Sequence, residues 1–331
     1  MRLYDIGERR AIKMILKILS KSENYVTSIG DDCAALDLGD EYLLVTSDMI
    51  TERTHIPPGM NPSQIGWFIV AINLSDIAAK GGKPLGVLLA LGLPRGTSDV
   101  FLKNLIRGAD RCASCFNTSI IGGDTKENSR LTLCGSAVGL VKKGEYMPRC
   151  GARVGDMVAV TGVLGRAAAG YIAIKHRLKN KGLTKGLYEP NPRLREGTVL
   201  SGLRVVSSCM DISDGLSSSL YQLRDINNVG FDIYLENIPV ASELDHIRRN
   251  LRVNVVDYAL HFGGDYELLV TLPEDSYRIA EERLRSIGCS FRAIGKVTDS
   301  GRVMIYKEGK GSILEDKGYE HFKRKNYRLK G

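Results

Sequence analysis

The sequence predicts an α/β (α+β) protein with two domains. Its 331 residues exceed the length at which a single hydrophobic core usually stops growing. Short apolar runs alternate with amphipathic stretches along both halves, and 43% hydrophobic residues with ordinary charge are typical of a globular protein. Gly, Arg and Asp dominate residues 150–156, so we expect domains over 1–150 and 151–331.

The first half alternates helices and strands. Four apolar residues near the N-terminus have the i, i+3, i+4, i+7 spacing of an opening helix: Ile12, Ile15, Leu16 and Leu19. Asn61 and Pro62 are typical of a helix start, and this helix extends to about Lys80. Ser98 caps the next helix. Apolar runs predict strands over 42–45, 85–93, 119–121 and 131–140. Thr46, Ser47 and Asp48 follow the end of the first of these strands.

The second half repeats this alternation. A strand over 157–160 leads into a Gly-rich turn and a helix, residues 211–215 precede another helix, 231–235 form a strand, and 277–287 form a helix. Residues 175–195 are rich in Lys and Arg and contain Pro190 and Pro192, which predicts a mobile loop.

Composition excludes several classes of protein. No apolar stretch approaches the roughly 20 residues of a membrane span, and the N-terminus lacks the pattern of a signal peptide, so we expect a cytoplasmic protein with no membrane association. Seven scattered cysteines indicate reduced thiols, with Cys112 and Cys115 structural. The net charge of +8 is spread along the chain and is densest in the tail 323–330, so we expect no nucleic-acid partner.

Six short acidic motifs recur beside apolar runs or Gly-rich turns. They occupy 30–32 (GDD), 46–48 (TSD), 73–76 (NLSD), 122–125 (GGDT), 211–215 (DISDG) and 263–267 (GGDYE). Taken singly, Asp214 is explained as a helix cap, Asp76 as a solvated helix residue and Asp31-Asp32 as a turn. Together they fit several Mg²⁺ ions held against a polyphosphate, because Mg²⁺ prefers oxygen ligands shared among carboxylates, water and phosphate. An ATP-dependent phosphoryl-transfer enzyme is therefore the first hypothesis, although the usual phosphate-binding motifs are absent.

The order of these motifs resembles the thiamine-monophosphate kinase family, within the aminoimidazole ribonucleotide synthetase-like superfamily. The resemblance rests on 29–34 (IGDDCA), 46–49 (TSDM) with His55, 71–82 (AINLSDIAAKGG), 122–125, 149–156 (RCGARVGD), 211–216 (DISDGL), 265–269 (DYELL) and 318–322 (GYEHF). The chain departs from the family pattern at Arg53, Ile106 and Gly264.

This resemblance implies a synthetase-like fold and in-line transfer of the ATP γ-phosphoryl group to thiamine monophosphate. It implies a homodimer that pairs the sheets of the N-terminal ATP- and Mg²⁺-binding domains, with a C-terminal domain completing the groove. The implied metal ligands are Asp31, Thr46, Ser47, Asp48, Asp76, Asp124, Asp211 and Asp214. Gly123, Asp124, Arg149 and Ser213 would bind ATP, and Asp48, Asp124, Arg149 and Asp214 would carry catalysis. His55, Asp265 and Tyr319 would shape the thiamine monophosphate pocket.

Two classes of alternative stay open. Sister synthetases share the fold. Selenophosphate synthetase has a reactive Cys or selenocysteine near its N-terminus, and this chain has no Cys before Asp31. The hydrogenase-maturation dehydratase ends in Cys, whereas this chain ends in Gly331. Aminoimidazole ribonucleotide synthetase lacks the combination of motifs 73–78 and 211–215 found here. A non-catalytic nucleotide-binding module would bind ATP without Mg²⁺-dependent turnover.

Overall fold

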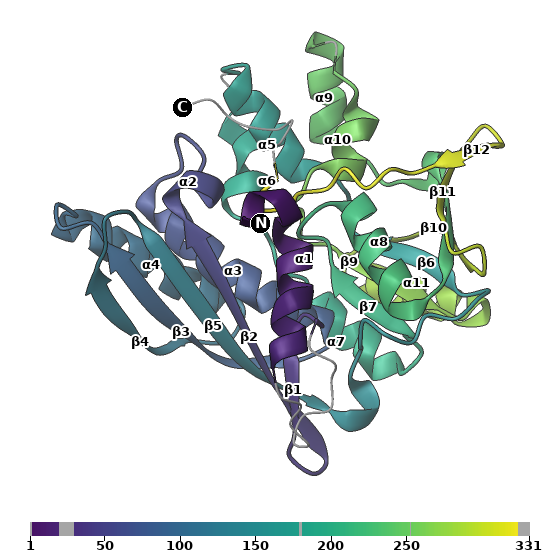
Figure 1. The fold of residues 1–331 in the computed structure, drawn as a ribbon, viewed down its shortest axis with the longest axis horizontal. Coiled ribbons are helices and arrows are strands. Elements are labelled where there is room, and N and C mark those ends of the chain that lie inside the picture. Colours follow the sequence, from purple (N-terminus) through teal and green to yellow (C-terminus); the bar gives the residue numbers. More distant parts are fainter. Residues whose placement is uncertain (1, 20–29, 179–180, 252, 324–331) are drawn as a thin grey trace.

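A computed structural model contains two β-sheets, each covered by helices (Figure 1). It describes all residues except 1, 20–29, 179–180, 252 and 324–331. The strands are β1 (Ala34–Asp37), β2 (Glu41–Thr51), β3 (Lys83–Leu93), β4 (Ile120–Glu127), β5 (Thr132–Lys142), β6 (Met157–Thr161), β7 (Ser208–Asp211), β8 (Gly230–Tyr234), β9 (Leu268–Leu272), β10 (Phe291–Thr298), β11 (Val303–Lys307) and β12 (Lys310–Ile313).

The α-helices are α1 (Leu3–Ile18), α2 (Glu52–His55), α3 (Pro62–Ala79), α4 (Asp99–Cys115), α5 (Arg166–Lys175), α6 (Lys185–Tyr188), α7 (Leu194–Leu203), α8 (Leu216–Asn227), α9 (Ser242–Asn250), α10 (Val255–His261) and α11 (Glu274–Ser286). The described residues also form the short 3₁₀ helices η1 (Lys143–Glu145), η2 (Lys181–Thr184) and η3 (Leu235–Asn237). Among the described helices, none combines the length and the apolar character that a membrane span requires.

The first sheet has the strand order β1-β2-β5-β3-β4, in which only β3 and β4 run parallel. Helices α3 and α4 lie on one of its faces (Figure 1). The second sheet has the order β12-β11-β8-β10-β6-β9-β7. One core joins it to α5, α8, α9 and α10, and a second core on its other face joins it to α7 and α11. The two-domain α/β prediction is confirmed.

Helix α3 is the central helix of the first half, and its start follows from sequence. The Asn61 side chain accepts a hydrogen bond from the Gln64 backbone N–H at 3.0 Å, and the Gln64 side chain accepts one from the Asn61 N–H at 3.1 Å. Pro62 occupies the first helical position, where no N–H is needed. Most of the helix is buried, since it packs between the first sheet, α4 and α7.

The predicted ends of two strands are wrong. Strand β2 continues to Thr51 instead of ending at Val45, so Thr46, Ser47 and Asp48 lie inside a strand and alternate between its faces. Strand β4 begins at Ile120 and continues to Glu127, so the motif 122–125 also lies inside a strand. Both extensions are paired along their length with neighbouring strands, whose hydrogen bonds hold residues that look like turn formers in sequence.

The prediction of a mobile loop over 175–195 is also wrong for its described part. Residues 181–188 form η2 and α6, which pack against α5, and Tyr188 is buried. The Tyr188 hydroxyl donates to the Pro58 carbonyl at 2.6 Å, and the Trp67 indole N–H donates to the Pro190 carbonyl at 2.8 Å. These long-range contacts hold a segment whose composition is that of a loop. Most of the basic tail 323–330 lies outside the described residues.

Close contact between α3 and α4 depends on glycine. A Cβ added at Gly108 would lie 1.8 Å from the Ser63 carbonyl oxygen, so Gly108→Ala must separate the helices. We expect it to lower the free energy of unfolding by about 1–3 kcal/mol, as overpacking does. Gly202→Ala on α7, where a new Cβ meets nothing within 4 Å, is the matched control and should be neutral or slightly stabilising. Equal chemical denaturation midpoints for the two variants would contradict this packing.

Candidate metal and nucleotide site

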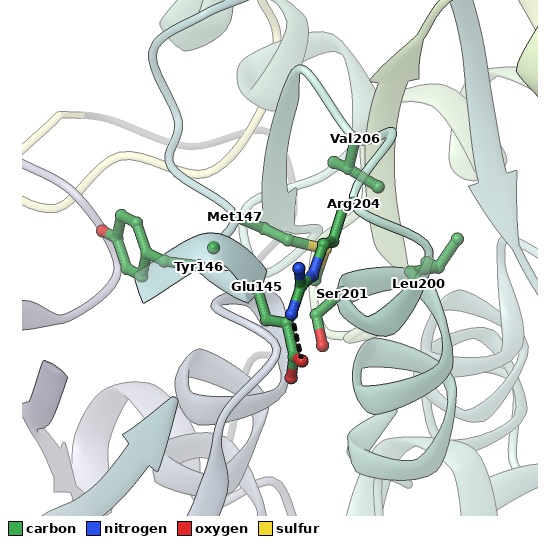
Figure 2. A pocket seen from close by; sticks show the side chains of 8 residues that line it. Glu145, Tyr146, Met147, Leu200, Ser201, Arg204 and Val206 are labelled. Atoms are coloured by element: carbon green, nitrogen blue, oxygen red, sulfur yellow. Dashed lines mark hydrogen bonds and ion pairs between the residues drawn. The ribbon is translucent and has the colours of Figure 1, made fainter. Parts of the chain in front are cut away.

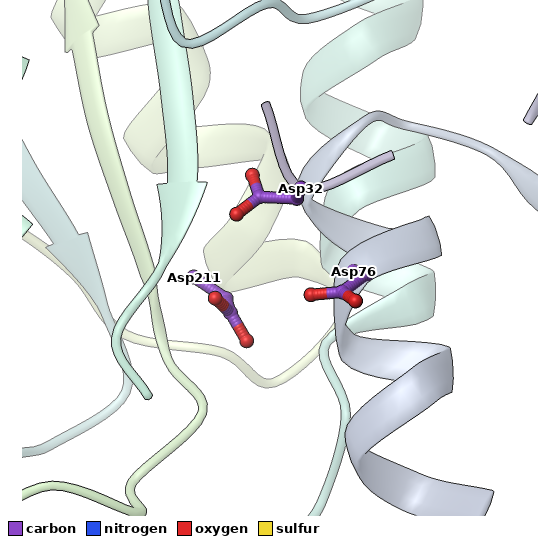
Figure 3. A group of neighbouring side chains, drawn as sticks. All are labelled: Asp32, Asp76 and Asp211. Carbon is purple, nitrogen blue, oxygen red and sulfur yellow. The ribbon is translucent and has the colours of Figure 1, made fainter. Parts of the chain in front are cut away.

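Three carboxylates from distant parts of the chain meet between the end of α3 and the end of β7 (Figure 3). Asp32 precedes β1, Asp76 lies near the end of α3, and Asp211 ends β7. Each offers an oxygen within 4.8 Å of the others. The site therefore joins the N-terminal and C-terminal halves, as the predicted groove requires.

Hydroxyl groups fix the orientation of two of these carboxylates. Thr46 Oγ1 donates to Asp76 Oδ2 at 2.5 Å, and Ser75 Oγ donates to Asp211 Oδ2 at 2.6 Å. The second bond links α3 of the first half to β7 of the second. Asp48 lies on the same face of β2 as Thr46, and its backbone N–H donates to Asn73 Oδ1 at 3.2 Å. The motifs 46–48 and 73–76 thus meet, as the family resemblance implied.

Asp31 lies beside this cluster and is fully engaged with protein groups. Its Oδ1 is 2.5 Å from Lys80 Nζ and accepts from the Asp32 N–H at 2.8 Å. Its Oδ2 accepts from the Tyr146 hydroxyl and from the Arg149 N–H, both at 3.1 Å. Neither Lys80 nor Tyr146 was predicted, although a lysine closing an otherwise apolar helix is an unusual sequence feature.

Two cations face the carboxylates. Lys80 Nζ lies 2.8 Å from Asp32 Oδ2, and the Arg149 guanidinium binds Asp32 Oδ1. Arg149 also donates to the Gly30 carbonyl at 3.0 Å and to Gln222 Oε1 at 3.2 Å. Burial opposes ionisation of Asp32, but Arg149 and Lys80 together hold its pKa below the usual range. Asp32, which was also not predicted as a ligand, is thereby kept charged.

The other buried carboxylates repel one another. Burial, with the nearby charge of Asp32, raises the pKa of Asp48 to about 6 and that of Asp211 to about 7. Burial and the charges of Asp48 and Asp211 raise the pKa of Asp76 well above its usual range. The region holds five carboxylates and two cations, Lys80 and Arg149. If all five carboxylates are ionised, three negative charges have no counter-ion among these groups; the five are Asp31, Asp32, Asp48, Asp76 and Asp211.

This donor set fits Mg²⁺. Asp32 Oδ2 is buried and makes no hydrogen bond within the described part of the chain, although it lies close to Lys80. Oxygen donors, excess negative charge and converging geometry are what a hard divalent cation requires. Asp32, Asp76 and Asp211, whose oxygens lie within 4.8 Å of one another, could hold such an ion, and Asp48 shares its face of β2 with Thr46, which donates to Asp76.

Two predicted metal ligands lie on the opposite face of the first sheet. Ser47 alternates with Thr46 and Asp48 along β2, and its hydroxyl is 2.9 Å from that of Ser136. Asp124 is exposed on β4, in register with Ala90 of β3, and pairs with Lys126 at 3.4 Å. Neither belongs to the cluster within one chain, so their role as ligands stays a prediction.

The remaining nucleotide candidates come from two segments. Ser213 and Asp214 lie in the loop between β7 and α8, close to the cluster, where the Ser213 carbonyl accepts from the Gly264 N–H at 2.7 Å. Gly123 is on β4, where an added Cβ would lie 1.8 Å from the Leu89 carbonyl oxygen. Gly123 thus belongs to the edge strand of the first sheet, whereas Ser213 follows an edge strand of the second.

Aromatic rings from α2 and from the C-terminal segment meet. The His55 and His321 ring centroids are 5.4 Å apart, and those of Tyr319 and His321 are 4.9 Å apart. The Tyr319 backbone N–H donates to the Asp214 carbonyl at 3.0 Å, which ties this ring cluster to the loop after β7. His55 and Tyr319 are therefore brought together, with His321 as an unpredicted member between them.

Asp265, the third predicted pocket residue, holds the start of α5. Its carboxyl accepts from the Gly165 N–H at 2.6 Å and the Ala167 N–H at 3.0 Å. Burial raises the pKa of Asp265 to about 7 even though these two N–H groups favour the charged form. Its proposed contact with substrate stays a prediction.

A cavity of about 50 Å³ lies elsewhere, between η1 and α7 (Figure 2). Arg204 donates to Glu145 Oε1 across it at 3.2 Å. Its volume suits one or two water molecules. None of the predicted site residues lines it, although Tyr146, which does, also donates to Asp31 beside the carboxylate cluster.

Known proteins resemble this chain in sequence over both of its halves. The chain matches the family models of AIR synthase related protein, N-terminal domain, over residues 30–141 and C-terminal domain over 153–307. It is 38% identical over 292 residues to the thiamine-monophosphate kinase of Methanospirillum hungatei, covering 88% of this chain and 92% of the relative. It is 34% identical over 322 residues to that of Pyrococcus horikoshii, covering 96% and 98%.

Solved structures give the same result. One described as AaThiL complexed with AMPPCP and TMP matches with a TM-score of 0.86 at 29% identity, covering 97% of this chain and 99% of that chain. The thiamine monophosphate kinase from Aquifex aeolicus matches with a TM-score of 0.78 at 26% identity, covering 94% and 99%. The HypE-HypF complex, at 21% identity, has a TM-score of 0.75 over 92% and 99% and shows the fold alone. The chain therefore belongs to the thiamine-monophosphate kinase family of AIR synthase related proteins.

Proposed function

We propose that this chain transfers the γ-phosphoryl group of ATP directly to thiamine monophosphate, which gives thiamine diphosphate and ADP. The observation that carries the proposal is the carboxylate cluster of Asp32, Asp76 and Asp211 in a chain whose relatives are thiamine-monophosphate kinases. A solved relative was described in complex with AMPPCP and TMP. Because ATP is a cytoplasmic metabolite, we place the reaction in the cytoplasm.

The chemistry suits a site without a general base. The acceptor is an ionised phosphate oxygen, so no proton has to be removed before attack. The protein must align two polyanions and offset their repulsion. Bound Mg²⁺ ions would supply most of the positive charge. Asp32, Asp48, Asp76 and Asp211 would hold them, and Arg149 adds a fixed guanidinium at the edge of the cluster.

The ring cluster suits the other substrate. Thiamine carries a flat, permanently charged thiazolium ring, and aromatic faces attract such cations. His55, Tyr319 and His321 present three rings within one small region, bonded through Tyr319 to the loop that carries Asp214. We therefore assign the thiamine end of the substrate to these rings and its phosphate to the carboxylate-bound metals.

Purified protein with ATP, Mg²⁺ and thiamine monophosphate should form thiamine diphosphate and ADP in equal amounts, measured by chromatography. Asp48→Asn removes a proposed metal ligand and should lower kcat by about a hundredfold or more. Asp225→Asn, an exposed carboxylate on α8, is the matched control and should retain activity. ADP without thiamine diphosphate would instead indicate a sister synthetase, and ATP binding without turnover would indicate a binding module.

Metal binding should depend on pH. The raised pKa values of Asp48, about 6, and Asp211, about 7, mean that protons compete with metal at these carboxylates near neutral pH. Affinity must therefore fall as pH falls, and between pH 8 and pH 6 we expect Kd for Mg²⁺ to rise roughly ten- to twentyfold. Calorimetric titrations in two buffers of different ionisation enthalpy would also show proton release at pH 6.5. A Kd that is constant over this range would contradict the competition.

We also propose that two copies pair through the face of the first sheet that lies opposite α3 and α4. This face exposes Met49, Leu85, Leu88 and Ile121, and it carries Ser47 and Asp124, which one chain alone leaves apart from the cluster. Exposed apolar surface of this kind usually marks an interface.

Pairing through this face can be tested with a single charge. Leu88→Asp should convert a dimer into a monomer in sedimentation, because it buries a carboxylate at the interface. Val100→Asp places the same change on an exposed apolar residue of α4, beyond the opposite face, and should leave the mass unchanged. A wild-type protein that is monomeric at micromolar concentration would refute the pairing.

A further inference from the structure

Tyr266 has a backbone conformation that is unusual for an aromatic residue. Its φ is +52°, in the left-handed region that residues with a bulky side chain rarely adopt. Most other left-handed non-glycine residues of the described chain lie within two residues of a helix end or in the hairpin after β11, where this conformation is ordinary: Asn117, Arg177, Arg204, Asn228 and Glu308. Tyr266 lies instead in the loop that leads into β9, so its conformation needs another reason.

Backbone hydrogen bonds to the loop after β7 hold Tyr266 in place. The Tyr266 N–H donates to the Ile212 carbonyl at 3.0 Å, and the Gly264 N–H donates to the Ser213 carbonyl at 2.7 Å. The Ile212 N–H in turn donates to the Glu267 carbonyl at 2.8 Å. The segment before β9 therefore runs beside the loop after β7, and these bonds fix the position of Tyr266 relative to that loop.

The two residues that flank Tyr266 are anchored within the second half of the chain. Asp265 accepts from the N–H groups at the start of α5, and Glu267 accepts from the Thr161 hydroxyl at 2.8 Å. The Tyr266 ring packs instead against the core of the first half. It meets the ring of Phe68 on α3 edge to face, with centroids 6.1 Å apart. The left-handed backbone therefore directs this one side chain across the junction between the two halves.

The Tyr266 hydroxyl makes no hydrogen bond within the part of the chain that the structure describes. The residue is partly exposed, and its hydroxyl oxygen is open to solvent instead of sealed in the interior. Burial, with the charges of Asp48, Asp211 and Asp214, raises the pKa of this phenol well above its usual range. The hydroxyl is therefore protonated and can donate to an anion that enters from solution.

Tyr266 lies between the two ends of the proposed substrate site. Its backbone partners, residues 212–213, directly follow Asp211 of the carboxylate cluster. They directly precede Asp214, whose carbonyl accepts from the Tyr319 N–H of the ring cluster. The proposed function assigns the thiamine ring to that cluster and the substrate phosphate to metals at the carboxylates. The group beside the Tyr266 hydroxyl is then the phosphate, whose charged oxygens are strong hydrogen-bond acceptors.

We propose that Tyr266 is a substrate-binding residue whose hydroxyl donates a hydrogen bond to a phosphate oxygen of thiamine monophosphate. The bond orients the acceptor phosphate for in-line attack, and it distinguishes thiamine monophosphate from thiamine without a phosphate. The left-handed backbone places a donor from the second half of the chain against α3. This inference rests on the proposed function and adds to it a residue that belongs neither to the carboxylates nor to the ring cluster.

Calorimetric binding of two ligands tests this bond without turnover. Thiamine monophosphate and thiamine differ only by the phosphate, and each is titrated in the presence of Mg²⁺ and a non-hydrolysable ATP analogue. Tyr266→Phe removes the hydroxyl and keeps the ring. We expect Kd for thiamine monophosphate to rise about tenfold, as loss of a hydrogen bond to a charged group predicts, while Kd for thiamine stays unchanged. The preference for the phosphorylated ligand should therefore fall about tenfold.

Tyr277→Phe is the matched control, because it removes a hydroxyl whose role is structural. The Tyr277 hydroxyl donates to the Phe291 carbonyl and accepts from the Ala293 N–H, both at 3.1 Å, between α11 and β10. Its removal should lower Tm and leave both Kd values unchanged. Tyr266→Phe should show the opposite pattern, because the Tyr266 hydroxyl has no protein partner to lose.

Several results would overturn the role of Tyr266. A fall in Tm like that of Tyr277→Phe, or a failure to fold, would show that the Tyr266 hydroxyl serves the fold. Equal weakening of both ligands, or no change in either Kd, would show that the hydroxyl does not bind the phosphate. A wild type that binds no thiamine monophosphate would instead contradict the proposed function itself.

Discussion

Mutual repulsion among buried carboxylates is the constraint around which this molecule is arranged. Asp32, Asp48, Asp76 and Asp211 come from a loop, a strand, a helix and a second sheet, so they meet only when both halves of the chain are folded together. Such a cluster is unfavourable unless cations are present. The same contacts that form the site therefore also determine how the two sheets sit against each other.

The protein offsets part of this cost with its own bonds across the junction. Ser75 of α3 donates to Asp211 of β7, and Lys80, at the end of the same helix, donates to the Cys209 carbonyl. Arg149 reaches Gln222 on α8 while it binds Asp32. These bonds leave excess negative charge, which the divalent cations that we propose for this site would offset.

The region of the ring cluster, to which we assign the thiamine end of the substrate, is likewise held together by the two ends of the chain. Arg9 of α1 binds Asp316 and donates to Ser218 on α8 at 2.6 Å, and Glu8 accepts from the His321 N–H at 3.0 Å. Gly7 has a φ of +75°, a left-handed conformation that favours glycine, where α1 approaches the Glu320 side chain. The N-terminal helix thus fixes the segment that carries the ring cluster beside His55.

Local sequence determined the helix starts, the alternation of α and β elements and the identity of most acidic residues in the cluster. Asn61 with Pro62 acts within one turn, and such short-range chemistry is readable without a fold. The lengths of β2 and β4 and the order in 181–188 were decided by long-range partners, which override local turn composition. Tertiary structure alone placed Ser47 on the opposite face of the sheet from Thr46, and it alone showed Lys80 saturating Asp31. The reason is that the sequence gives the type of each residue. Which acceptor positions of a carboxylate are occupied depends on the distant donor groups that the fold brings to it.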